Sequence, residues 1–171
     1  MDNLDNRKNN KTLLWIGGGC LIIFLCILIL IVSGTGGIMW LGLQTPENID
    51  VSINTPINID VGDTVELIVT ITNTGTSSVE LNSIDISLNY LNGFVVEETT
   101  PPFTETSQFD AWFVDETYQT FYFYQAIESG ETLSIVFNAQ AVLTGDFSGD
   151  IDVCIDSESN CKTSIARTIV R

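Results

Sequence analysis

Apolar and polar side chains alternate along several segments of this chain. Between Val61 and Gly75 the sequence reads VGDTVELIVTITNTG, and every second residue from Val65 to Ile71 is apolar. The same period of two returns in four later segments, at 84–90, 118–127, 133–141 and 151–155. Such alternation is typical of strands that are buried on one side. The pattern therefore predicts a chain built mainly from short strands.

Turn residues and weaker strands complete the expected fold. Short strands are predicted at 94–96 and at about 162–170, and 99–108, which begins TTPP, is expected to be a loop. The tetrapeptide NIDV occurs at 48–51 and again at 58–61, and Pro56 between the copies predicts one edge strand broken in its middle. No helical pattern follows Gln44. The expected architecture is all-β: an antiparallel β-sandwich of seven to eight strands.

The N-terminal part has a different pattern. Residues 12–46 contain no charged side chain, and Leu13–Val32 is an unbroken run of apolar, glycine and cysteine residues. About 20 residues in a helix span the hydrocarbon core of a bilayer, so the run predicts one transmembrane α-helix. We therefore divide the chain into a tail at 1–12, a transmembrane helix and interfacial segment at 13–43, and an outer domain at 44–171. A cleaved signal peptide, whose apolar region is normally shorter, and a buried helix of a soluble protein are the alternatives.

Two tryptophans and three basic residues orient the predicted helix. Trp15 and Trp40 are roughly 25 residues apart, which on a continuous helix places them near the two membrane interfaces that tryptophan prefers. A chance spacing is the alternative. Arg7, Lys8 and Lys11 precede the run, and a basic flank stays in the cytoplasm. We expect a single-pass cell-membrane protein with a cytoplasmic N-terminus, lipid around its helix and an extracytoplasmic C-terminal domain.

Two short motifs resemble a known group of surface domains. Gly62-Asp63, the alternating strand and the closing Asn73-Thr74-Gly75 resemble the second strand of bacterial and archaeal immunoglobulin-like surface domains of the cell-adhesion-related (CARDB) and conserved-repeat types. Gly130-Glu131-Thr132, ahead of the strand at 133–137, is similar to a later strand of the same group, with Ser129 in place of the usual proline. The resemblance covers most of 45–150 and implies an immunoglobulin-like (Ig-like) sandwich. It implies no particular activity.

Charge and composition exclude several functions. Of 22 acidic and six basic residues, Asp2, Asp5 and the three basic residues of the tail lie outside the domain, which keeps 20 acidic and three basic residues. This net charge of −17 disfavours nucleic acid as a partner. The chain has no histidine, which excludes Ser-His-Asp and Cys-His catalysis. We expect no cofactor and no enzymatic activity.

The two cysteines of the outer domain, Cys154 and Cys161, are predicted to form a disulfide. A hairpin with its turn at 156–159 pairs 155 with 160, and therefore 154 with 161, within bridging distance. Thiols outside the cytoplasm also oxidise readily. Two free thiols, or a metal site that includes Asp156, are the alternatives.

Two groups of side chains are candidates for ligand binding. One is the acidic group near the C-terminus, which suggests weak calcium binding or, as the simpler interpretation, a solvated face: Asp146, Asp150, Asp152 and Asp156. The other is an aromatic group suited to stacking on sugar rings or, alternatively, packed under neighbouring strands: Trp112, Tyr118, Tyr122 and Tyr124.

These observations favour a non-catalytic module at the cell surface. The outer domain is expected to have a structural, adhesive or interaction role with a protein partner at the cell surface. The tail of about 12 residues is too short for a signalling domain, so any signal is expected to pass through the membrane helix of a partner. The alternative is a glycan- or cation-binding module that uses the aromatic group or the acidic group.

Overall fold

The computed structural model describes residues 29, 45–111 and 115–171, and the chain divides into two compact units, 1–44 and 45–171. The expected tail, Trp15 and Trp40 lie outside the described residues, as does the expected helix apart from Ile29. Within the described residues, no helix is long and apolar enough to cross a membrane. The transmembrane segment therefore remains an expectation.

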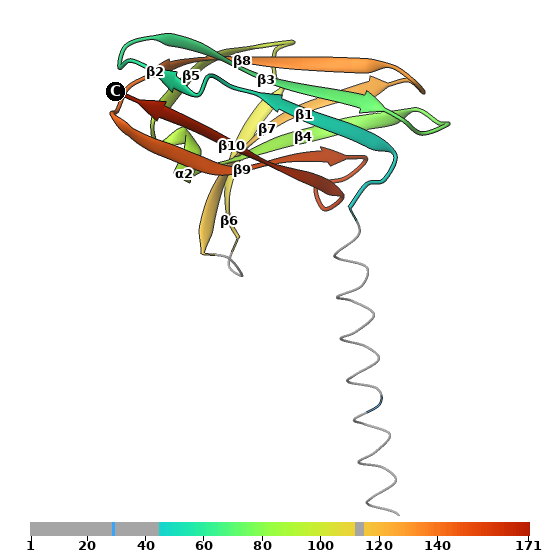
Figure 1. Cartoon of the computed structure of the whole chain (residues 1–171). Helices are drawn as coiled ribbons and strands as arrows, with labels where there is room; N and C mark the ends of the chain where they lie inside the picture. The colour runs from blue at the N-terminus through green and yellow to red at the C-terminus, as the bar shows by residue number, and fades with distance from the viewer. Residues whose placement is uncertain (1–28, 30–44, 112–114) are drawn as a thin grey trace, which may run out of the picture. The chain divides into compact units, whose positions relative to one another are not determined.

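The unit 45–171 consists of two β-sheets that pack face to face (Figure 1). The four-stranded sheet has the order β1-β3-β8-β5, and the six-stranded sheet has the order β2-β10-β9-β4-β7-β6. The strands of the first sheet are β1 (Ile49–Asn54), β3 (Thr64–Asn73), β8 (Thr132–Ala141) and β5 (Phe94–Thr100). Those of the second are β2 (Asn58–Ile59), β10 (Cys161–Val170), β9 (Gly145–Ile155), β4 (Val79–Ser87), β7 (Glu116–Ile127) and β6 (Glu105–Ala111).

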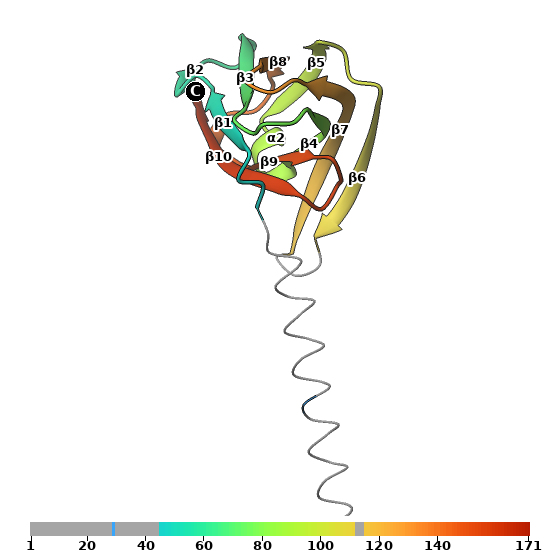
Figure 2. The ribbon, with the colours of Figure 1, turned by 90° about the vertical axis from the view of Figure 1, so that its right-hand side faces the viewer.

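The order of the strands is that of an immunoglobulin-like sandwich. When β1, β3, β4, β5, β8, β9 and β10 are lettered A to G in chain order, β1, β3, β8 and β5 take the places of the ABED sheet. β4, β9 and β10 then take those of the CFG sheet. The β6–β7 hairpin is an addition between β5 and β8, and it extends the second sheet beside β4. Figures 1 and 2 show one end of β6 and β7 projecting beyond the rest of the sandwich.

The alternating residues recognised in the sequence form the core between the sheets. Val69, Ile71, Ile84 and Ile135 are completely buried, and Phe121 and Phe123 pack edge-on against Phe137. Burial of such side chains stabilises the fold by about 1.5–3 kcal/mol each. Gly62 and Gly130 lie just before β3 and β8, and both have a positive φ that other residues rarely adopt (92° and 78°).

Three local predictions need correction. The described residues form ten strands rather than seven to eight, because β2 is a separate strand of two residues and because β6 starts at Glu105, inside the segment expected to be a loop. The side chains of β6 are exposed except at Ala111, so this strand has no apolar alternation to reveal it. A one-turn helix, α2 (Leu88–Leu91), replaces the end of the strand predicted at 84–90, and the Ser87 hydroxyl caps it by accepting from the Asn89 amide.

Pro56 breaks the first edge strand, as predicted, and the two halves then join different sheets. β1 pairs with β3 as far as Asn54 opposite Ile68. After Pro56 the chain crosses to the other sheet, where β2 pairs in parallel with the end of β10. The two halves therefore cover part of an edge of each sheet: β1 lies beside 68–73 of β3, and β2 lies beside the end of β10.

The predicted disulfide is present. Cys154 and Cys161 lie directly opposite each other on β9 and β10, and their sulfurs are bonded. The Ile155 amide donates to the Asn160 carbonyl (3.0 Å), which is the expected register of the hairpin. The bond links the last two strands of the domain.

Candidate functional site

Members of both groups of candidate side chains lie on the outer face of the six-stranded sheet. In β9, Ile151, Val153 and Ile155 are buried in the core, so the residues between them face outward. In β7, Phe121 and Phe123 take the inner side in the same way. β4 lies between these strands. We call the outer surface formed by the following residues the acidic–aromatic face: Asp85, Glu105, Phe109, Glu116, Tyr118, Tyr122, Tyr124, Asp150 and Asp152.

Asp85 lies at the centre of this face and was not recognised in the sequence. The register places it directly between Asp152 on β9 and Thr120 on β7. Its side chain is only 5% exposed, and among the described residues its Oδ1 atom has no hydrogen-bond partner. Burial, with a contribution from the charge of Asp152, raises the pKa of Asp85 from 3.8 to about 6. The centre of the face therefore holds a carboxyl group that titrates close to neutral pH.

Asp150 and Asp152 form the acidic border of the face on β9. Burial raises the pKa of both carboxyl groups, and the nearby Glu116 charge adds to the effect. The Thr163 hydroxyl donates to Asp152 Oδ1 (2.5 Å), which opposes part of the rise for that residue. Positive charge supplied by a partner would stabilise these ionised carboxylates.

The other two aspartates of the acidic group lie elsewhere. Asp146 accepts two hydrogen bonds from the Arg167 guanidinium (2.8 and 2.6 Å), which lower the pKa of its carboxyl group. Asp156 accepts from the Glu80 amide (2.8 Å) and fixes the turn after β9 to β4. The four aspartates suggested for calcium are therefore not brought together.

A different group of metal-type ligands surrounds the disulfide. Among the described residues, Asp85, Cys154 and Cys161 form the only group of three such side chains with ligand atoms within 4.8 Å of one another. The two sulfurs are bonded to each other, and Asp85 Oδ2 lies 3.5 Å from Cys154 Sγ. A disulfide sulfur supplies neither a thiolate nor a proton, so in this state the group is no metal site.

Tyr118 is packed rather than available for stacking on a ligand. Its ring is buried under Phe109 of β6, with centroids 5.3 Å apart and planes 9° apart. Its hydroxyl donates to Glu116 Oε2 (3.3 Å), and burial together with the Glu116 charge raises its pKa. Glu116 also accepts from Ser87 and Asn89, so this corner of the face is a connected polar network.

Tyr122 and Tyr124 form the exposed aromatic part of the face. Their rings stack at 5.6 Å with planes 19° apart, and Tyr124 is 44% exposed. The Tyr124 hydroxyl donates to Glu105 Oε1 (3.0 Å), and the Tyr122 hydroxyl lies 3.4 Å from Ser107 Oγ. Both contacts connect the ring pair to β6. Trp112, the fourth predicted aromatic residue, lies outside the described residues.

A β-bulge lies beside the two rings, which strand alternation places on the same side of the sheet. The register between β4 and β7 shifts between Leu81 and Ser83, opposite Gln125 and Tyr122. Tyr124 lies in this irregular stretch with φ at 51°, in a region that costs a bulky side chain roughly 1–2 kcal/mol. Bulges of this kind redirect side chains, and backbone strain collects at functional positions. The bulge therefore marks the Tyr122–Tyr124 pair as the strongest ligand-binding candidate on the face.

Comparison with known proteins shows similarity to solved structures at low sequence identity. No family model matches the chain, and no curated protein matches it. Among solved structures, the alkylpurine DNA glycosylase AlkC of Pseudomonas fluorescens is 12% identical over 72% of this chain (TM-score 0.43), and the match spans 30% of the glycosylase chain. A cohesin module from Clostridium perfringens is 12% identical over 72% of this chain and 96% of its own (TM-score 0.40). A CARDB domain from Pyrococcus furiosus is 15% identical over 74% of this chain and 92% of its own (TM-score 0.39). At these identities and TM-scores, the similarities assign no function to this chain.

Proposed function

We propose that this chain is a non-catalytic interaction domain of the cell surface, and that its acidic–aromatic face binds a basic protein partner. The observation that carries the proposal is the Tyr122–Tyr124 stack, which a strained backbone holds next to Glu105. Aromatic faces attract lysine and arginine through cation–π interactions, and carboxylates beside them add direct charge attraction. Tyrosine is also enriched at protein interfaces.

The proposed location outside the membrane is supported by two features. The first is the Cys154–Cys161 disulfide, because such bonds persist mainly in oxidising compartments. The second is the uncharged run at 13–32 behind a basic flank, which suits a membrane anchor with its N-terminus in the cytoplasm. The anchor would hold residues 44–171 at the outer surface.

The proposed lack of catalysis rests on the burial of Asp85. Asp85, with its pKa near 6, is the carboxyl group best suited to acid–base chemistry, but its side chain is buried. A general acid or base must reach the proton that it transfers. We therefore attribute the raised pKa of Asp85 to its burial within the sheet rather than to a catalytic role.

Site-specific photo-crosslinking in intact cells tests the proposal. A photoreactive phenylalanine derivative replaces Tyr124 in the full-length chain, and in a matched control it replaces Val95, which is exposed on β5 of the other sheet. Crosslinking to a protein from position 124, weakened by high salt and absent from position 95, is expected. Equal crosslinking from both positions, or none from position 124, would contradict the proposal.

Glycan binding is the second candidate, and the stacked tyrosine pair is the observation that favours it, because aromatic rings stack on sugar rings. A glycan array probed with the full-length chain separates the two functions. Binding to a glycan that Tyr124→Ala abolishes, together with no protein crosslink, would favour the glycan.

A further inference from the structure

The first half of β3 has a free edge. β8 pairs with β3 from Thr64 onward, but β1 on the other side pairs only as far as Ile68. The chain leaves this edge after Asn54, because Pro56 directs it toward the other sheet. Within the part of the chain that the structure describes, residues 64–67 therefore have a strand neighbour on one side only. An unpaired edge exposes backbone N–H and C=O groups that a further strand can bind.

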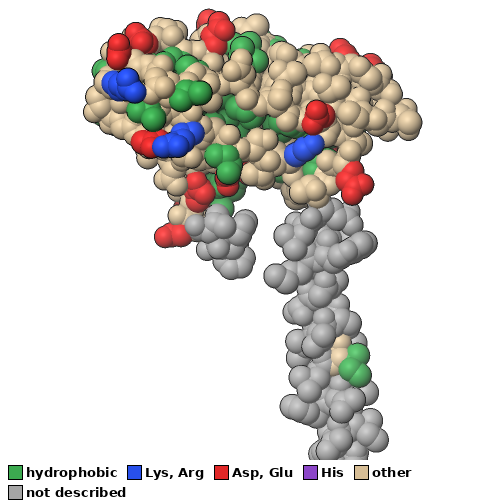
Figure 3. Space-filling view, viewed as in Figure 1, with side chains coloured by type: hydrophobic (Ala, Val, Ile, Leu, Met, Phe, Trp, Pro, Cys, Tyr) green, Lys and Arg blue, Asp and Glu red, His purple; other side chains and the backbone are tan. Residues whose placement is uncertain are grey.

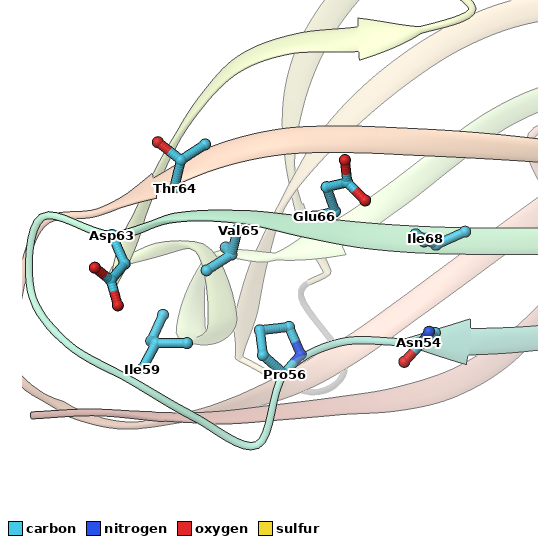
Figure 4. A pocket seen from close by; sticks show the side chains of 8 residues that line it. All are labelled: Asn54, Pro56, Ile59, Asp63, Thr64, Val65, Glu66 and Ile68. Carbon is cyan, nitrogen blue, oxygen red and sulfur yellow. The ribbon is translucent and has the colours of Figure 1, made fainter.

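A hollow of about 500 Å³ lies along this free edge (Figure 4). Val65 borders it from β3, and Pro56 and Ile59 border it from the segment that crosses between the sheets. Asn54 lies at the end where β1 stops. The hollow occupies the place that β1 would fill if it continued straight past Asn54.

Side chains alternate along the free edge. Val65 and Leu67 are buried toward the core, whereas Thr64 and Glu66 are exposed on the outer side. A strand added here would place every second side chain toward Val65 and Ile59 and the others beside Glu66. The inward positions suit apolar residues.

The surroundings of the hollow are apolar and acidic. Ile57 is 72% exposed, and Val61 is also exposed, in the connection that borders the hollow. Figure 3 shows exposed apolar side chains beside both acidic and basic ones at the end of the molecule that carries β2 and the C-terminus. Glu66 and Asp63 line the hollow, and the Arg171 guanidinium donates a hydrogen bond to Asn58 Oδ1 on β2 (3.0 Å). With a net charge of −17 on the domain, the outward positions of an added strand suit lysine or arginine.

We propose that the free edge of β3 accepts an extended segment of a partner protein as an added strand that runs in the direction of β1. The segment has apolar residues at alternate positions and lysine or arginine between them. Such β-augmentation takes its affinity from backbone hydrogen bonds and its specificity from alternate side chains. This site is separate from the acidic–aromatic face and does not depend on it.

A labelled eight-residue peptide of alternating valine and lysine tests the proposal. Its binding to the full-length chain in detergent is measured by fluorescence anisotropy, and the binding region is mapped by hydrogen exchange. We expect amides within 64–67 to become protected. A peptide with N-methyl groups on the amides of one edge is expected to bind about tenfold more weakly, because it loses two or more hydrogen bonds.

A charge reversal with a matched control tests whether acidic side chains beside the free edge select a basic segment. Glu66→Lys is expected to weaken the peptide about fivefold, whereas Glu97→Lys on β5, at the opposite edge of the same sheet, leaves its affinity unchanged. Equal effects of both variants, no loss on N-methylation, or protection away from 64–67 would overturn the proposal. So would self-association of the chain through this edge, which would make a second copy the occupant.

Discussion

At the scale of single residues, Asp85 is expected to make stability depend on pH. Its pKa is about 6 in the folded chain and 3.8 ordinarily, so between these values the folded state binds more protons than the unfolded state. The free energy of unfolding should therefore fall by about 3 kcal/mol as the pH rises from below 3.8 to above 6. Asp85→Asn, which removes the charge, should be more stable than the original chain at pH 8 and should show a shallower fall, as measured by urea denaturation at a series of pH values.

The exposed Glu97→Gln is the control for this measurement and should leave the pH dependence unchanged. Asp150 and Asp152 also have raised pKa values, so a smaller fall should remain in Asp85→Asn. An identical pH dependence in Asp85→Asn and in the original chain would show that ionisation of the Asp85 carboxyl group does not lower the free energy of unfolding.

Glycine substitutions at Tyr124 and Tyr122 should differ in their effect on stability but not in their effect on partner binding. Its positive φ costs a tyrosine roughly 1–2 kcal/mol, and glycine removes that cost. Tyr124→Gly should therefore destabilise the chain by at least about 1 kcal/mol less than Tyr122→Gly, although each loses the same ring stack. Both variants should lose the protein crosslink, which in this comparison is read from a photoreactive group at the neighbouring, exposed Ser107 on β6. Equal destabilisation by the two substitutions would contradict the role given to the bulge.

At the scale of elements, the disulfide is expected to stabilise the β9–β10 hairpin. The bonded cysteines are seven residues apart, and closure of so short a loop contributes about 2–3 kcal/mol. Reduction should lower the free energy of unfolding by this amount while the β-rich circular dichroism spectrum is retained. Peptide mapping of the unreduced protein should find 154 linked to 161. If reduction unfolds the domain completely, the bond supports far more than its own hairpin.

At the scale of the whole molecule, the predicted topology places 1–12 inside the cell and 44–171 outside. Protease added to intact cells or spheroplasts should therefore remove the β-sandwich. A tag at the N-terminus should become accessible only after lysis, and a cytoplasmic protein serves as the control for leakage. Protection of the C-terminus before lysis would contradict this orientation.

The sequence by itself determined the features that depend on neighbours along the chain. The strands at 64–73 and 132–141 follow from alternation, because one side of each must be buried against the opposite sheet. The Cys154–Cys161 bond follows from the length of one hairpin turn. The break at Pro56 follows from the donor that proline lacks. Each of these depends on local geometry, so each could be derived before any tertiary contact was known.

Only the tertiary structure decided what lies beside what. β6 is almost entirely polar and exposed, so nothing in its composition indicates a strand, and only its pairing with β7 makes it one. Asp85 appears as an ordinary polar position of an alternating strand, yet the sheet order places it between Asp152 and Thr120 and buries it. The free edge of β3 exists because the chain changes sheets after Asn54. These features arise from contacts between segments far apart in sequence, and local alternation carries no information about which strands become neighbours.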